Sequence, residues 1–353
     1  MPRDAEVSAD ASTDAIADAS TGVSTDASAP SSTRIYASMA GDHEVLELDG
    51  ETYEVVRRFA VDQGPAILLG TPDHRKLFTA NRVAQSVSTI ELDSGEISTL
   101  PVGGVPYVIA MNPAGTRLYA GIYPSGIAVI DTATSQLEKT LATPELAASI
   151  IVSPDSDVLY VASIPPFGEG TLRAVSASTG EVLKQPIPVG ETPAWIAISQ
   201  DGRRVYTLNY TSDDIAVVDT EGWRVIEKIQ TGDGSQGISG HVTPDGRALY
   251  VTKFGTGELI RIDTSSNEIT QTIKLAGRPL GVNFSPDGKR VYVTDFGPGT
   301  LDQPTSDFLP YLLAGPYEGP EQGRVSAFDV VSGARLAEVL IGKGPTSLVV
   351  DAR

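Results

Sequence analysis

A short apolar strand built around an aromatic residue recurs seven times along the chain. The steps between successive aromatic positions are 42, 41, 41, 46, 44 and 42 residues, and these positions are Tyr36, Phe78, Tyr119, Tyr160, Tyr206, Tyr250 and Tyr292. A period of about forty residues filled with short strands is typical of a β-propeller, because one blade is a four-stranded sheet of about that length. The pattern therefore predicts an all-β, seven-bladed β-propeller.

Each period repeats the same order of strands and turns. A first apolar strand ends in a turn such as Ser-Pro-Asp-Gly at 285–288, which suits the backbone angles of a tight hairpin into the aromatic strand. A third strand ends at Asp in six of seven periods, as at Asp263, and Ser176 is the exception. We expect this side chain to cap the following turn. A fourth strand leads into a loop rich in Gly and Pro, such as 277–279.

Neither end of the chain holds a complete blade. The chain enters at a second strand near Ile35 and leaves with a first strand over residues 346–350. Pairing this last strand with the N-terminal sheet would complete the seventh blade and remove its open edge. We therefore predict velcro closure by the C-terminal strand of one domain over residues 34–353. Residues 1–33 consist mainly of Ala, Ser, Thr and Asp, which predicts a disordered tail.

The composition limits the partners and the compartment. With 26 basic and 45 acidic residues the net charge is −19, whereas nucleic-acid binding needs clustered Lys and Arg, so no nucleic acid is expected as a partner. No apolar run is long enough to span a membrane, and the first residues lack the features of a signal peptide, which predicts a cytoplasmic protein without membrane contact. If Met1 is not the native start, secretion remains open. The absence of Cys excludes disulfides and thiolate metal sites.

The repeated Ser-Pro-Asp-Gly, Val-Tyr-Val-Thr and Ile-Asp-Thr motifs recur in register, and they resemble those of YVTN-type β-propeller repeat proteins over residues 34–353. The resemblance implies the seven-bladed fold. It says less about activity, because similar seven-bladed propellers include lactonases and streptogramin-type lyases. Those lyases use a paired His and Glu with a divalent metal, a pattern that this chain does not reproduce.

His241 is the leading candidate for catalysis. Ligands of propellers bind at the mouth of the central channel, on the face formed by the fourth-to-first and second-to-third strand loops. His241 is the only imidazole at its position in the first strands, and it follows a glycine-rich stretch that allows close approach of a ligand. A histidine with a pKa near neutrality is a natural general base. The alternative is a core histidine bonded to a neighbouring blade.

The loops supply the remaining candidates. Tyr210, Lys253 and Asp295 join His241 as predicted catalytic residues, and Lys253 and Asp295 could form an ion pair in the mouth. The predicted ligand-binding residues are His43, Asn81, Arg82, Tyr123, Trp195, Asn209, Arg278, Asn283, Phe296, Phe308 and Tyr311. Each alone is more often a solvated loop residue, but their equivalent placement in different blades favours a common axis. The chain's three histidines lack metal-ligand spacing, so neither a metal site nor a cofactor is expected.

The segment 296–322 is much longer than the equivalent loops of the other blades. Long loops in compact domains commonly serve as lids or binding loops, and the apolar residues from Phe308 to Leu313 should pack on the ring face. We predict a lid, with a plug or a protein-docking patch as alternatives. The leading function is small-molecule binding at the channel mouth, with non-redox acid-base catalysis of the lyase, hydrolase or cyclase type. The alternative is a non-catalytic scaffold that binds a protein partner through 296–322.

Overall fold

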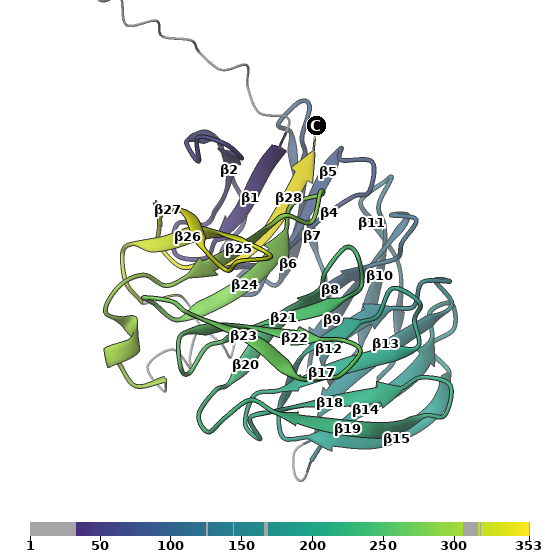
Figure 1. The fold of residues 1–353 in the computed structure, drawn as a ribbon. Coiled ribbons are helices and arrows are strands. Elements are labelled where there is room, and N and C mark those ends of the chain that lie inside the picture. Colours follow the sequence, from purple (N-terminus) through teal and green to yellow (C-terminus); the bar gives the residue numbers. More distant parts are fainter. Residues whose placement is uncertain are drawn as a thin grey trace, which may run out of the picture. The chain divides into compact units, whose positions relative to one another are not determined.

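The structure is a computed structural model that describes residues 33–124, 126–143, 145–165, 169–305, 317 and 319–352. Within these residues the chain forms seven four-stranded antiparallel sheets and one short 3-10 helix, η1 (Thr300–Asp302). The all-β, seven-bladed architecture predicted from the repeat is confirmed. Figure 1 shows the sheets as successive blades, coloured along the sequence.

The strands of each blade run in order from the channel outward. Blade 1 contains β28 (Pro345–Ala352), β1 (Thr33–Met39), β2 (Glu44–Asp49) and β3 (Val55–Ala60); blade 2 contains β4 (Pro65–Gly70), β5 (Lys76–Asn81), β6 (Ser86–Glu91) and β7 (Ile97–Pro101). Blade 3 contains β8 (Val105–Met111), β9 (Arg117–Tyr123), β10 (Ile127–Asp131) and β11 (Gln136–Leu141); blade 4 contains β12 (Leu146–Val152), β13 (Val158–Ile164), β14 (Gly170–Ser176) and β15 (Val182–Gly190).

The last three blades follow the same order. Blade 5 contains β16 (Pro193–Ile198), β17 (Arg204–Asn209), β18 (Asp214–Asp219) and β19 (Arg224–Gln230). Blade 6 contains β20 (Gly237–Val242), β21 (Ala248–Lys253), β22 (Glu258–Asp263) and β23 (Ile269–Lys274), and blade 7 contains β24 (Pro279–Phe284), β25 (Arg290–Asp295), β26 (Gly323–Asp329) and β27 (Arg335–Gly342).

The ring closes by pairing the two ends of the propeller. The C-terminal strand β28 lies antiparallel to β1, with Ile35 opposite Val350 and Tyr36 opposite Val349, as the yellow and purple strands of Figure 1 show. Leu348 of β28 is buried in a core cluster that also contains Tyr292 of blade 7. The predicted velcro closure is therefore confirmed.

The aromatic strands supply the core between blades. Tyr36 of blade 1, for example, is buried against Leu68, Leu77 and Ile90 of blade 2. The hydrophobic clusters thus form where the face of one sheet packs against the next, because each second strand is buried on both sides. This packing leaves the fourth strands on the outside of the ring.

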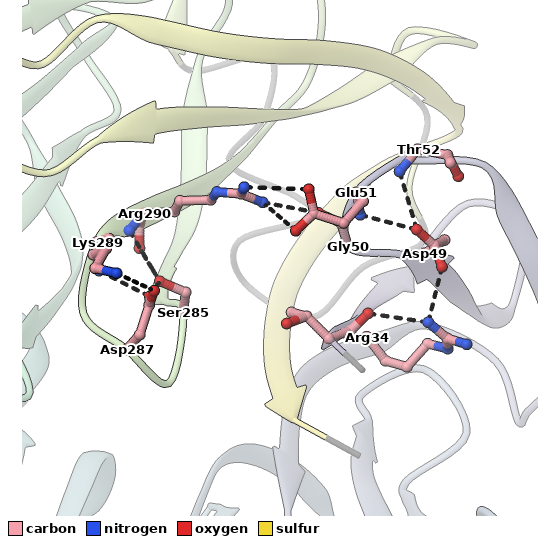
Figure 2. Close-up of polar contacts among 10 residues, drawn as sticks. Arg34, Asp49, Gly50, Glu51, Thr52, Ser285, Asp287, Lys289 and Arg290 are labelled. Carbon is pink, nitrogen blue, oxygen red and sulfur yellow. Dashed lines mark hydrogen bonds and ion pairs between the residues drawn. The ribbon is translucent and has the colours of Figure 1, made fainter. Parts of the chain in front are cut away.

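The turn face shows why the Ser-Pro-Asp-Gly and Asp motifs recur. The Ser285 hydroxyl donates to Asp287 at 2.6 Å and accepts the Arg290 backbone N–H at 2.9 Å, which closes the hairpin (Figure 2). Asp49 at the end of β2 accepts backbone N–H groups of Glu51 and Thr52 at 2.9 and 3.0 Å. These bonds show the capping role predicted for the third-strand Asp.

A basic side chain at the start of the second strand ties neighbouring blades together on this face. Arg290 of blade 7 donates to the Gly50 carbonyl at 3.2 Å and to the Glu51 carboxylate at 3.1 and 3.3 Å (Figure 2). Equivalent contacts join blade 2 to blade 3 and blade 5 to blade 6, through Lys76 with Thr132 and Arg204 with Thr264. The seam between blades 7 and 1 therefore carries the same lateral contact as the continuous part of the ring.

Candidate functional site

A cavity of about 180 Å³ lies on the loop face at the mouth of the channel, and every blade lines it. Near the start of each first strand, one or two residues lack an opposite residue on the second strand. Such β-bulges re-aim side chains and are common next to functional sites. The bulge residues that line the cavity are Ala66, Tyr107, Ala148, Ala194, Ile238, Leu280 and Thr346.

The reasoning from sequence missed this ring of bulges, although a local signal was present. In five blades the bulge residue directly follows the loop proline, as Tyr107 follows Pro106; Ala147 and Gly237 replace the proline in blades 4 and 6. Proline cannot donate to the sheet and often marks the first residue of a strand or a bulge. The position after the loop proline was therefore the place to look for the cavity lining.

Arg82 is the only charged side chain among the described residues that line the loop-face cavity. Its Nη2 donates to the Tyr107 carbonyl at 2.9 Å, and its guanidinium carbon lies 5.3 Å from the centre of the Tyr107 ring. Its buried Nε has no acceptor among the described residues. A cation with unused donors in a mostly apolar pocket is suited to a ligand that brings an oxygen acceptor.

Tyr210 also lines the loop-face cavity, from blade 5. Burial raises the pKa of its hydroxyl to about 12, although Arg278 acts in the opposite direction. The hydroxyl is therefore protonated at neutral pH and can donate a hydrogen bond to a ligand. It is not a strong candidate for removing a proton.

Phe296 supports the wall of the cavity from behind. It is fully buried in a cluster with Phe254 and Leu280, against which Tyr210 and Tyr317 pack. Its ring centre lies 6.0 Å from that of Phe254 and 5.2 Å from that of Tyr317. It is not among the residues that line the cavity.

Arg278 anchors the described start of the 296–322 insertion. Its side chain donates to the carbonyls of Thr300 at 2.9 Å, Phe254 at 3.0 Å, Gly255 at 2.9 Å and Gln303 at 2.6 Å. These bonds fix the segment around η1 against blade 6. The structure thus places Arg278 as a support of the loop, outside the cavity lining.

Four predicted site residues occupy one repeated position at the end of the second strand. Each pairs with the opposite residue at the start of the third strand in its own blade, which is the first residue of that strand except at Arg324, the second residue of β26: Asn81 with Ser86 at 3.1 Å, Asn209 with Asp214 at 2.6 Å, Lys253 with Glu258 at 2.6 Å, and Asp295 with Arg324 at 2.9 Å. The expected Lys253–Asp295 ion pair is not formed, because each already has a partner within its blade. None of the four lines the loop-face cavity.

The two ionic pairs differ in their electrostatics. Burial opposes ionisation of Glu258, but hydrogen bonds from Lys253, Lys274 and Thr256 outweigh it and lower its pKa to about 2. Burial raises the pKa of Asp295, and the Arg324 guanidinium only partly offsets it. Lys253 is consequently held within its blade by the ionised Glu258 carboxylate and does not reach the loop-face cavity.

His241 and Asn283 line a second cavity at the turn end of the channel, with Gln200, Pro244 and Pro286. The His241 ring lies 5.6 Å from that of Trp195, in an edge-to-face contact. Burial lowers the pKa of His241 to about 4, so the imidazole is neutral at neutral pH.

Trp195 links the two cavities. It lines the loop-face cavity, and its Nε1 donates to the Gly240 carbonyl at 2.7 Å beside His241. The structure therefore brings Trp195, Tyr210 and Arg82 together around one cavity and places His241 and Asn283 around the other.

The remaining predicted residues lie at the rim or outside the described chain. His43 is exposed, and its Nδ1 accepts the Gly64 backbone N–H at 3.3 Å. Tyr123 is exposed beside Tyr107, with 6.2 Å between the ring centres. Phe308 and Tyr311 fall outside the described residues. Across the described part of the chain, no three His, Asp or Glu side chains gather as a metal site would require.

Comparison with known proteins identifies the family and the fold. The family model described as Lactonase, 7-bladed beta-propeller, matches residues 117–295. The periplasmic gluconolactonase PpgL of Pseudomonas aeruginosa has 20% identity and a TM-score of 0.69, with 91% of this chain and 99% of that chain covered. No curated protein sequence matches the chain significantly. Among the described residues no helix is long and apolar enough to cross a membrane.

Two further solved structures share the architecture. The hydrazine synthase of Kuenenia stuttgartiensis has 18% identity and a TM-score of 0.64, covering 73% of this chain and 91% of that chain. The dihydro-heme d1 dehydrogenase NirN in complex with DHE has 18% identity and a TM-score of 0.63, covering 90% and 74%. At such identities, these likenesses show the fold alone.

Proposed function

Because the chain belongs to the lactonase family of seven-bladed β-propellers, we propose that it binds a small cyclic ester in the loop-face cavity and hydrolyses it. The observation that carries this proposal is Arg82, the only charged group among the described lining residues of a protein with a net charge of −19. At roughly 15 Å³ for each water-sized group, a cavity of about 180 Å³ holds on the order of a dozen such groups. This is the size of a small lactone.

The chemistry assigned to Arg82 is stabilisation of developing negative charge. In hydrolysis by hydroxide, the hydroxide oxygen bonds to the ester carbonyl carbon and the carbonyl oxygen becomes an oxyanion. The ring C–O bond then breaks, and the released alkoxide takes the proton of the new carboxyl group to give a hydroxy carboxylate. A guanidinium that donates to the carbonyl oxygen stabilises the oxyanion more than the neutral ester, which lowers the barrier. Tyr210, on blade 5, donates to another oxygen of the ligand.

This proposal gives the attacking water no side-chain base. The described lining of the loop-face cavity contains neither an imidazole nor a carboxylate, and Tyr210 has a pKa of about 12. Attack by hydroxide then sets the rate. The prediction that His241 is a general base remains the competing hypothesis, and its pKa of about 4 would give an inflection of the rate near that pH.

Substitution of Arg82 tests the proposed function. We expect Arg82→Met to lower kcat/KM for δ-valerolactone or glucono-δ-lactone by about a hundredfold, and Arg82→Lys to lower it less, with turnover followed by acid release. Arg203→Met is the matched control, because it removes an exposed arginine from the turn face. Equal activity of Arg82→Met and Arg203→Met would show that Arg82 has no role in the reaction. If the parent protein hydrolyses no lactone, the proposed activity is wrong.

In the same proposal the 296–322 insertion covers the loop-face cavity. Its described ends support this placement: η1 is anchored by Arg278, and Tyr317 packs on Phe296 behind the cavity wall. Glu321 then forms an ion pair with Lys343 at 2.7 Å, beside blade 1. Both described ends of the insertion thus contact residues of the loop face.

A further inference from the structure

Among the Phe, Trp and Tyr side chains of the described residues, only Tyr123 is exposed, with 52% of its surface accessible. The other exposed large apolar side chains lie on the outer fourth strands or in the turn after β26: Val55, Val56, Leu137, Val182, Leu183, Ile226, Ile269, Val331, Leu336 and Leu340. Tyr123 alone lies at the loop end of a second strand. Its position, next to a residue that lines the cavity, distinguishes it from scattered surface residues.

Tyr123 continues a row of groups in contact that begins inside the loop-face cavity. The Arg82 guanidinium lies over the Tyr107 ring, and the Tyr107 ring contacts that of Tyr123 at a tilt of 52°. We call these three residues the Arg82 ladder. Burial raises the pKa of Tyr107, so Arg82 is the only charge on the ladder.

The backbone of Tyr123 is firmly placed although its side chain is exposed. Tyr123 is the last residue of β9 and pairs with Val105 of β8. A Cβ on Gly104 would lie 2.4 Å from the Tyr123 carbonyl oxygen, so only glycine allows this close approach of the two chains. A tyrosine on a fixed backbone has few side-chain torsions to restrict on binding, which suits it to a contact platform.

We propose that the Arg82 ladder is a two-part specificity site that selects a cyclic ester bearing a second ring. An acceptor oxygen of the ligand lies at Arg82, and the face of the second ring packs on the exposed Tyr123 ring. An aryl ring and a sugar ring both offer such a face, since each presents C–H groups or π-density to tyrosine. The part of this inference that concerns the ester rests on the proposed function. The contact of the second ring with Tyr123 does not depend on it.

Direct binding tests the ring contact separately from turnover. The probes are the ring-opened hydroxy acids of δ-valerolactones that carry a phenyl group, a glucosyl group or no ring on the same linker. Titration calorimetry measures their affinities for the parent protein, Tyr123→Ala, Tyr123→Phe and the control Val331→Ala, which truncates a 90% exposed side chain on the turn face. Unchanged melting temperatures establish that the variants fold.

We expect Tyr123→Ala to weaken binding of one ring-bearing probe by about three- to tenfold, while Tyr123→Phe and Val331→Ala leave it unchanged. If Tyr123→Ala loses affinity only for the phenyl probe, the ligand carries an aryl ring. If it loses affinity only for the glucosyl probe, the ligand carries a sugar ring. The proposal is overturned if Tyr123→Ala loses as much affinity for the ringless probe as for the ring-bearing ones, or if it loses affinity for none of the probes. Ring-dependent binding without hydrolysis of any lactone would refute the proposed activity and leave the specificity site standing.

Discussion

The half-buried histidine at the turn end of the channel, His241, makes the stability of the propeller depend on pH. Burial lowers the pKa of His241 to about 4 from an ordinary value of 6.5. Between these values the unfolded chain binds more protons than the folded chain, so stability rises with pH and is lost as pH falls from 6.5 to 4. The linkage relation gives a loss of about 2 kcal/mol from pH 7 to pH 5 and about 3 kcal/mol by pH 4.

Replacement of the His241 imidazole separates its effect on stability from that of the Asp and Glu carboxylates, whose protonation at low pH also changes stability. His241→Phe keeps an aromatic ring against Trp195 but cannot take up a proton. We expect the free energy of unfolding of His241→Phe, measured with denaturant at several pH values, to gain about 2 kcal/mol relative to the parent between pH 7 and pH 5. His43→Asn is the matched control, because His43 is exposed at φ 58° and Asn tolerates that conformation.

Parallel pH dependence in the parent and His241→Phe would refute the reasoning. It would mean that water or a polar partner solvates the imidazolium in the turn-end cavity. The imidazole would then titrate closer to neutrality, and the prediction that it acts as a general base would regain support.

Three further predictions concern the mechanism, the ring and the insertion. If no side-chain base acts, log kcat/KM should rise by about 1 for each pH unit from pH 6 to pH 9, and a plateau would point to a titrating base. Deletion of 345–353 removes β28 and exposes strand edges, so we expect aggregation or a large fall in melting temperature. Deletion of 1–30 should change the melting temperature little, and an equal fall for both deletions would contradict the closure and tail assignments. Replacement of 304–316 by a short Gly-Ser link, with both anchors kept, should preserve the melting temperature and weaken lactone binding; unchanged binding would favour a protein-docking role.

The fold could be predicted from the sequence because its determinants are local and repeated. The aromatic strand around Tyr250 and the turn around Asp287 recur once per blade, and each depends on residues within a few positions. The half-blades at the two ends also predicted the pairing of β28 with β1, because an unpaired edge has few other solutions. The seven-bladed ring and its closure therefore followed from local patterns alone.

The orientation of side chains at the loop ends depended on the tertiary structure. Lys253 and Asp295 occupy equivalent positions in their repeats, which suggested a shared axis, but the opposing strands offered Glu258 and Arg324 within each blade. A charged side chain that turns into its own blade gains an ion-pair partner there, which offsets the cost of removing it from water. The sequence contained both partners and the order of the strands, but no indication of whether these side chains turn toward their own blade or toward the channel.

The sequence by itself determined the number of blades, their order, the closing strand and the turn chemistry. Only the tertiary structure decided which side chains meet at the channel mouth, because seven bulges shift the register just after the loop and expose at least one residue of each blade to the cavity. The bulge in β8 brings Tyr107 of blade 3 into contact with Arg82 of blade 2. His241 lies further along its own strand and lines the cavity at the turn end of the channel. A local pattern specifies the strand, but the crowding of seven strands around one axis specifies where each side chain points.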